Sequence, residues 1–199
     1  MQRFRHPQCK ESFENYAKKT TIRYAERDEQ KRQEFIDEIE ALPEDTELHY
    51  CDESGFDEYY AREYGYAVRG VKVVNEVSGK HFARMSIVAA KCGDDIIAPF
   101  AFKGTMNGDL FEGWLEYVYV PSLINPANVV LIIDNASAHR KYNILDIAEE
   151  FGFRVIFLPP YSPDLNKTIE NFWANVKRRL RFHMHEFETF LDALCHAFQ

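Results

Sequence analysis

Three acidic side chains stand where the sequence predicts the end of a strand or the start of a helix. Asp52 and Asp134 each follow an apolar run, and Glu170 begins a helical pattern after a proline-rich loop. Ligands of α/β sheets bind at the carboxyl ends of strands, so both aspartates could face one crevice, with the glutamate supplied by a packed helix. Carboxylates so close repel one another unless divalent cations neutralise them. Such a site suits Mg²⁺ or Mn²⁺, and two of these ions can hold the attacking and leaving oxygens of a phosphoryl transfer.

Position alone is weak evidence for this metal site. The chain contains 32 Asp+Glu, and some acids end strands by chance or serve as helix caps and turn formers. Asp134 and Asn135 could simply form a turn. We place Glu53 outside the metal ligands because side chains alternate along a strand, so it should point away from Asp52.

The helix that begins near Glu170 also carries cations. Helical spacing along the adjoining face leads from Glu170 to Ala174, Lys177 and Arg181, with Arg178 beside them. These cations could bind the phosphates of DNA. The alternative is that they are ordinary solvated charges, which are favoured near the C-terminus of a helix.

The first half of the chain contains the elements that would carry Asp52. Apolar residues at helical spacing predict a surface helix over 28–42 that stops at Pro43. Runs of strand-forming residues between turn signals then predict a meander of antiparallel strands. Their expected ranges are 47–52, the beginning of 55–70, 71–77, 81–90 and 96–102.

The second half of the chain alternates helices and strands. A helix is expected over 108–119, and the continuous apolar run at 129–133 predicts a strand buried on both faces. The remaining elements are a helix over about 137–151 that stops at Gly152, a strand over 154–158, and helices from 169 and from about 186. This order indicates an α/β fold with a mixed central sheet and flanking helices.

The composition excludes several classes of protein. The 199 residues are 46% hydrophobic, enough for one sizeable folded domain. No apolar run approaches the roughly 20 residues of a membrane helix, and the polar N-terminus carries no signal-peptide segment. Four cysteines without a C-x-x-C pair indicate neither a zinc site nor a disulfide framework, and favour a reducing, cytoplasmic setting. The formal net charge of -8 argues against a wholly basic DNA-binding surface but leaves room for a local basic patch.

Three segments resemble the signature blocks of the mariner-like bacterial insertion-sequence transposases. They occur in the family's order, and the resemblance extends from about residue 26 to the C-terminus. The segments are YCDESG at 50–55, LIIDNASAH at 131–139 and LPPYSPDLN at 158–166, the last running into IENFW at 169–173, with REYGY at 62–66 and RG at 69–70 in addition.

This resemblance implies an RNase H-like fold of the integrase and transposase superfamily. It implies that Asp52, Asp134 and Glu170 are the catalytic, metal-binding acids of a site for two Mg²⁺ or Mn²⁺ ions. A lone histidine at the start of a helix is more often structural than catalytic. The position of His139 in the family's Asp-Asn-Ala block nevertheless implies a supporting role near the metals or the scissile phosphate.

The chain departs from the family at one point. Three residues, Lys167, Thr168 and Ile169, separate the Ser-Pro-Asp-Leu-Asn run from Glu170, where the family usually has two. We expect a longer loop, with Thr168 as the N-cap of a helix that starts one residue later and with Glu170 in its usual place. Pro159, Pro160 and Pro163 should stiffen this loop.

The function implied by the resemblance is that of a DNA transposase catalytic domain. Metal-activated water would hydrolyse the phosphodiester bond at transposon ends, and the freed 3′-hydroxyl would attack target DNA at a short TA-containing site. The implied partners are transposon-end and target DNA, bound by a dimer, in a bacterial cytoplasm on the nucleoid. No membrane is involved.

Two other functions are compatible with the same residues. One alternative is a catalytically inactive RNase H-like relative that binds or regulates DNA, which the extra residue before Glu170 would favour. The other is a metal-dependent nuclease of the same fold that acts on RNA or branched DNA.

We expect residues 1–43 to form an N-terminal arm or linker with the surface helix, and 44–199 to form the catalytic domain. Family members carry helix-turn-helix modules ahead of that domain, so this chain is expected to be a fragment or the second reading frame of a split element.

Overall fold

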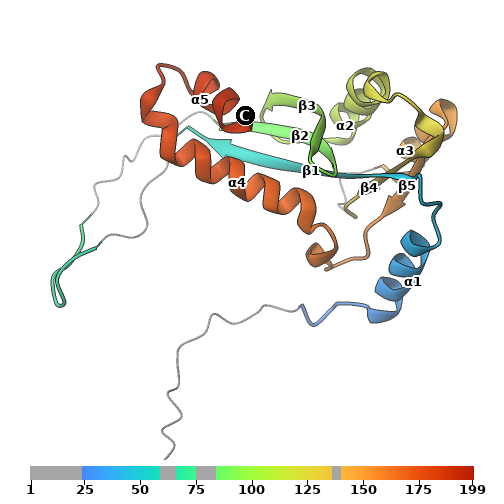
Figure 1. Ribbon diagram of the computed structural model, residues 1–199, viewed down its shortest axis with the longest axis horizontal. Helices are drawn as coiled ribbons and strands as arrows, with labels where there is room; N and C mark the ends of the chain where they lie inside the picture. Colours follow the sequence, from blue (N-terminus) through green and yellow to red (C-terminus); the bar gives the residue numbers. More distant parts are fainter. Residues whose placement is uncertain (1–23, 59–65, 75–83, 136–139) are drawn as a thin grey trace, which may run out of the picture.

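The computed structural model describes residues 24–58, 66–74, 84–135 and 140–199, which fold around one five-stranded sheet (Figure 1). The strand order is β3-β2-β1-β4-β5. β1, β2 and β3 form an antiparallel meander, whereas β4 and β5 run parallel to β1, so the sheet is mixed as predicted. The strands are β1 (Glu47–Asp57), β2 (Arg84–Cys92), β3 (Asp95–Lys103), β4 (Val129–Ile133) and β5 (Arg154–Phe157).

Helices cover both faces of the sheet. On one face, α2, α3 and a π-helical turn pack against β-strand residues that include Cys51 and Leu131. On the other face, α4 and α5 pack against residues around Phe56, while α1 packs Phe35 against Val130 and Ile132. Figure 1 shows α4 running along β1 and α2 and α3 on the opposite side. The helices are α1 (Glu29–Glu40), α2 (Gly108–Trp114), α3 (Lys141–Phe151), α4 (Lys167–His183) and α5 (Phe190–Phe198), and the π-helical turn is Leu115–Tyr119.

Local sequence explains several of these elements. Asp28 caps α1 by accepting hydrogen bonds from the backbone N–H groups of Gln30 and Lys31. α3 ends at Gly152, whose φ of 77° is left-handed and whose N–H donates to Ala148. All five residues of β4 are buried, which confirms the expectation of a strand covered on both faces.

The first strand is longer than the sequence indicates. We expected a strand over 47–52 and a second from 55, but β1 continues without a break to Asp57. The two neighbours of β1 differ in length: the parallel partner β4 pairs only as far as Tyr50, whereas the antiparallel partner β2 pairs from Tyr50 to Asp57. Asp52 therefore lies within a strand and not at its end.

Other boundaries also differ from expectation. Residues 71–74 form no strand, and 75–77 lie outside the described residues. The helix expected over 108–119 changes to a π-helical turn after Trp114, and α3 begins at Lys141 instead of 137. The last helix begins at Phe190 and not near 186, because Thr189 Oγ1 caps it by accepting a hydrogen bond from the backbone N–H of Asp192. None of the helices described in the structure is long and apolar enough to cross a bilayer.

Candidate active site

The strand register brings Asp52 level with Asp134. Tyr50 of β1 is paired with Ile132 of β4, and each aspartate lies two residues further along its chain. Because side chains alternate along a strand, Asp52 shares a face with Tyr50, and Asp134 continues the face of Ile132. β4 ends at Ile133, so Asp134 stands at the carboxyl edge of the sheet, where an α/β fold places ligands.

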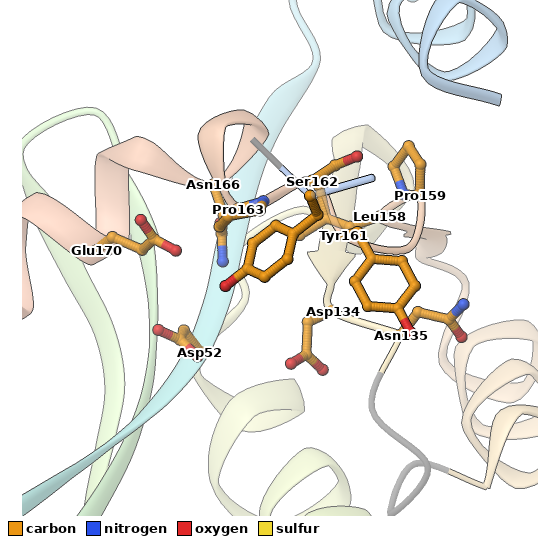
Figure 2. A pocket seen from close by; sticks show the side chains of 11 residues that line it. Asp52, Asp134, Asn135, Leu158, Pro159, Tyr161, Ser162, Pro163, Asn166 and Glu170 are labelled. Carbon is orange, nitrogen blue, oxygen red and sulfur yellow. The ribbon is translucent and has the colours of Figure 1, made fainter. Parts of the chain in front are cut away.

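The two aspartates and Glu170 line one pocket of about 420 Å³. Its wall comes from β1, the end of β4, the loop after β5 and the first turn of α4. Figure 2 shows the side chains of Asp52, Asp134, Glu170 and Asn166 around this space. The sequence-predicted acids are thus brought together from three elements that lie far apart in the chain.

The electrostatics of Asp52 reflect this crowding. Burial raises its pKa from 3.8 to about 7, and the charges of Asp134 and Glu170 add to the rise. The backbone N–H of Glu53 donates to Asp52 Oδ1 at 2.8 Å and opposes the shift. A carboxyl held at such a pKa binds a proton readily, and a divalent cation can replace that proton.

Glu170 stands in the first turn of α4. Its backbone N–H donates to the carbonyl of Asn166 at 3.2 Å, so the helix already includes Lys167, Thr168 and Ile169. The predicted N-cap at Thr168 is therefore wrong: the extra residue lies in the first helical turn and not in a longer loop. Burial and the charge of Asp164 raise the pKa of Glu170, and Lys167 opposes them.

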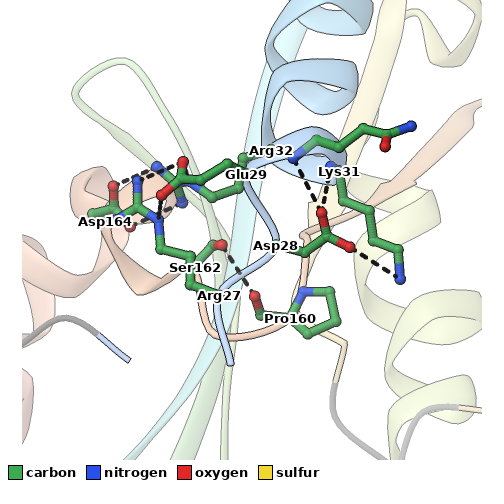
Figure 3. A network of polar contacts seen from close by, with 9 residues as sticks. Arg27, Asp28, Glu29, Lys31, Arg32, Pro160, Ser162 and Asp164 are labelled. Carbon is green, nitrogen blue, oxygen red and sulfur yellow. Dashed lines mark hydrogen bonds and ion pairs between the residues drawn. The ribbon is translucent and has the colours of Figure 1, made fainter. Parts of the chain in front are cut away.

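The loop between β5 and α4 is held by an ion pair that the sequence does not reveal. Arg32 of α1 donates from Nη1 to Asp164 Oδ1 at 3.0 Å and from Nη2 to Oδ2 at 2.7 Å. Arg27 lies 3.7 Å from the same carboxylate, and Ser162 Oγ donates to the Pro160 carbonyl at 3.1 Å (Figure 3). The loop that leads to Glu170 is thus attached to α1 and stiffened by its own prolines.

Two tyrosines line the pocket without having been predicted. The rings of Tyr24 and Tyr161 lie 5.7 Å apart, and both contribute to the pocket wall. Tyr161 has a φ of 56°, a strained value for a residue with a side chain. Tyr24 lies ahead of α1, and no pattern in the sequence connects it with the acids.

The side chains around the pocket allow a test of whether it fits a cation. Asn166 is 4% exposed and lines the pocket, and its Oδ1 is buried without a hydrogen-bond partner among the described residues. Figure 2 shows the amide nitrogen of Asn166 directed toward the space between the acids, so this oxygen is not counted as a donor to an ion. The three carboxylates form an all-oxygen donor set, which fits a hard divalent ion such as Mg²⁺ or Mn²⁺.

The predicted DNA-binding cations divide into two groups along α4. Lys177 lines a hollow with Asp52, Glu170 and Ala174, and its Nζ lies 5.6 Å from the centre of the Phe56 ring. Burial lowers the pKa of Lys177, while the negative charge of Asp52 opposes this. Arg178 and Arg181 line a separate hollow further along the helix, with Arg179, Phe182, His183 and His185.

His139 lies in 136–139, outside the described residues. The next residue, Arg140, is described and anchors the start of α3 to α2. Its Nε lies 2.6 Å from Glu112 Oε1, and it also pairs with Asp109. Arg140 therefore attaches the start of α3 to α2 in the helical layer on their face of the sheet.

Several solved structures of the Mos1 transposase resemble the fold of this chain. The Mos1 transposase paired-end complex with left transposon end matches with a TM-score of 0.68 and 16% identity, over 84% of this chain and 54% of that one. The mariner Mos1 paired-end complex with Mg matches with a TM-score of 0.61 and 15% identity, over 77% of this chain and 49% of that one. The Mos1 paired-end complex with Mn matches with a TM-score of 0.62 and 15% identity, over 92% of this chain and 64% of that one. The chain thus spans about half to two thirds of the length of these proteins. The fold is RNase H-like, as expected from the sequence.

No curated protein matches the chain. A family model described as "DDE superfamily endonuclease" matches residues 47–192, which include Asp52, Asp134 and Glu170. This match covers most of the chain and every strand of the sheet. The chain therefore belongs to the family of DDE superfamily endonucleases.

Proposed function

We propose that this chain is the catalytic domain of a DNA transposase of the mariner-like bacterial insertion-sequence type. It would hydrolyse the phosphodiester bond at transposon ends and transfer the freed 3′-hydroxyl to target DNA. The observation that carries this proposal is the pocket lined jointly by Asp52, Asp134 and Glu170. The transposase complexes that resemble the chain support the choice of DNA as substrate.

The residues of the pocket would hold two Mg²⁺ or Mn²⁺ ions through the three carboxylates. When bound, such ions supply an activated water and stabilise the leaving oxygen of an in-line displacement. The protein's own contribution is orientation: Asp52 is held by the pairing of β1 with β2, and Glu170 by a helix whose preceding loop is bound by Arg32. No nucleophilic side chain is required, since water and then the DNA hydroxyl attack phosphorus.

Lys177, Arg178 and Arg181 would bind the DNA backbone along α4. Lys177 lines a hollow with two of the acids, so a phosphate it contacts would lie close to the scissile bond. The exposed Tyr161 ring at the pocket could stack against a base or sugar of the strand being cut. We include His139 as a supporting residue and a dimer on DNA as the assembly, with residues 44–199 as the catalytic domain.

The rival proposal is an inactive relative, and we favour the active enzyme for a structural reason. The extra residue before Glu170 was the best support for inactivity. It lies in the first turn of α4, and Glu170 still lines the same pocket as the two aspartates. All three acids are thus available to one bound cation pair.

Metal-dependent cleavage of DNA tests the proposal. The full chain should nick supercoiled DNA with Mn²⁺ or Mg²⁺ but not with Ca²⁺ or chelator, and should join a pre-cut 3′-hydroxyl end to a target duplex. Asp134→Asn should abolish both reactions, while Asp146→Asn, an exposed aspartate of α3, should leave them unchanged. Folded protein that binds DNA but neither cuts nor joins it would favour the inactive relative. Cleavage restricted to RNA or branched DNA would favour the nuclease.

A further inference from the structure

A second cluster of potential metal ligands lies away from the acidic pocket, where β1 begins and β2 ends. One carboxylate oxygen of Glu47, a ring nitrogen of His49 and the Sγ of Cys92 all lie within 4.8 Å of one another. The register that pairs Tyr50 with Lys91 sets His49 opposite Cys92, and Glu47 follows on the same face of β1. Three different ligand types thus converge from two neighbouring strands.

The imidazole of His49 is held in the orientation that a metal ligand needs. Only 2% of the residue is exposed, and its Nδ1 lies 2.9 Å from the hydroxyl of Tyr119. Its Nε2 faces the cluster, 3.3 Å from Glu47 Oε2. When Nδ1–H donates to Tyr119, Nε2 presents its lone pair to the cluster.

We propose that Glu47, His49 and Cys92 bind a zinc ion, with a water molecule as the fourth ligand. Zinc accepts this mixture of carboxylate oxygen, imidazole nitrogen and thiolate sulfur in tetrahedral geometry. Tetrahedral zinc places its ligand atoms about 3.5 Å apart, which small side-chain rotations can reach from the present separations. Binding replaces the thiol proton of Cys92, so one proton is released to solvent for each ion bound and no redox change occurs.

The proposed zinc site is separate from the acidic pocket. His49 and Asp52 are three residues apart on β1, so they point to opposite faces of the sheet about 10 Å apart along the strand. The zinc ligands lie on the face covered by Tyr119, whereas the acids lie on the face of α4. A metal at this site would connect β1 to β2 and would stabilise the fold without entering the phosphoryl chemistry. No zinc motif is visible in the sequence because His49 and Cys92 are 43 residues apart and lie on different strands.

Cobalt spectroscopy on the full chain tests the proposal without interference from the acids. Co²⁺ bound to a thiolate gives a sulfur-to-metal charge-transfer band, which carboxylates cannot produce. We expect a saturable band at one ion per chain that Zn²⁺ displaces. Cys92→Ser should abolish it, while Cys195→Ser, at an exposed cysteine of α5, should leave it unchanged. Tyr119→Phe keeps the ring but removes the hydroxyl that orients His49, and should weaken binding by about tenfold or more.

A second measurement on the unaltered protein guards against a variant that fails to fold. Zn²⁺ should slow alkylation of Cys92, measured by peptide mass spectrometry, without slowing that of Cys195. The melting temperature should rise with Zn²⁺ in Asp52→Asn, whose acidic pocket lacks one carboxylate, but not in the double variant Asp52→Asn/Cys92→Ser. Absence of the charge-transfer band, its survival in Cys92→Ser, or alkylation of Cys92 unaffected by Zn²⁺ would each overturn the proposal.

Discussion

Arg32 and Asp164 form a bidentate ion pair that joins α1 to the loop in front of α4, with N–O distances of 3.0 and 2.7 Å. The Arg32 side chain is 7% exposed and that of Asp164 37%. Burial acts to raise the pKa of Asp164, but the hydrogen bonds and charge of Arg32 outweigh it and hold the pKa below 3.8. A helix ahead of the family-matched region thereby fixes the loop that presents Glu170.

Removing this ion pair should reduce both stability and cleavage. Arg32→Ala removes a largely buried guanidinium and two charge-assisted hydrogen bonds, so the free energy of unfolding should fall by about 1–3 kcal/mol. Arg32→Lys should recover little, because a lysine cannot form the bidentate pair. Urea denaturation measures the first effect, and DNA nicking under conditions where every variant is folded measures the second.

Arg154→Ala is the matched control for Arg32. Arg154 also pairs with a carboxylate of α1, Glu38, at 3.4 Å, but both partners are about half exposed. Such a pair contributes about 0–1 kcal/mol, so this variant should keep nearly full stability and activity. If Arg32→Ala cuts DNA as fast as Arg154→Ala, the loop needs no anchor on α1.

Asp52→Asn should stabilise the metal-free protein while removing its metal response. The folded-state pKa of Asp52 is about 7, against 3.8 for the free side chain, so the folded chain binds more protons between these values. Stability of the unaltered protein therefore falls as pH rises from about 4 to about 7. Asparagine carries no charge, so the stability gain of the variant should grow through this window and level off above it, at about 4 kcal/mol at most.

Thermal melts in chelator at a series of pH values measure this effect, with Asp94→Asn in the exposed β2–β3 turn as a control. Mn²⁺ should raise the melting temperature of the unaltered protein at pH 8 more than at pH 6, because protons compete with the ion for Asp52. The same ion should leave Asp52→Asn nearly unchanged. If the stability difference between Asp52→Asn and the unaltered protein did not change with pH, the pKa of Asp52 would not be raised in the folded protein.

The cations of α4 should contribute to DNA affinity by neutralising phosphates. Lys177→Ala and Arg181→Ala should each weaken binding uniformly across sequences and reduce the slope of log K against log salt by about 0.9 for each phosphate that is no longer neutralised. Fluorescence anisotropy over a salt series measures both quantities. Lys103→Ala, an exposed cation at the end of β3, should change neither. An unchanged slope for all three variants would show that the α4 cations are only solvated charges.

Much of the fold could be predicted because local patterns follow the sheet. The apolar run of β4, the Gly152 stop of α3 and the Asp28 cap of α1 are all readable from neighbouring residues. The true length of β1 could not be read in this way. It depends on β2 continuing beside β1 after β4 has ended, which is a property of the partners and not of residues 47–57.

The candidate site was only partly visible for a related reason. Asp52, Asp134 and Glu170 stand in recognisable motifs. Tyr24 lines the pocket and Arg32 binds the loop in front of Glu170, and both come from the segment ahead of the sheet, where only a surface helix and an arm were expected. The start of α4 was misplaced because the helix begins without a side-chain cap. The hydrogen bond from the backbone N–H of Glu170 to the carbonyl of Asn166 sets that start, and it is not predictable from the residue types.

Asn166 should show opposite effects on stability and on function. Its Oδ1 is buried and has no partner among the described residues, so the metal-free protein carries the cost of an unsatisfied acceptor. Asn166→Ala removes that acceptor and should leave the free energy of unfolding unchanged or raised by up to about 1 kcal/mol in chelator, since part of the gain is offset by the small cavity created. Because the Asn166 amide lines the pocket beside the acids, with its nitrogen directed toward them, the same variant should bind Mn²⁺ at least several-fold more weakly and cut DNA more slowly. Asn171→Ala, at an exposed asparagine of the same helix, should change neither property. Calorimetric Mn²⁺ titration together with chemical denaturation measures both effects, and a variant that loses stability while keeping its Mn²⁺ affinity would make Asn166 a structural residue of the loop.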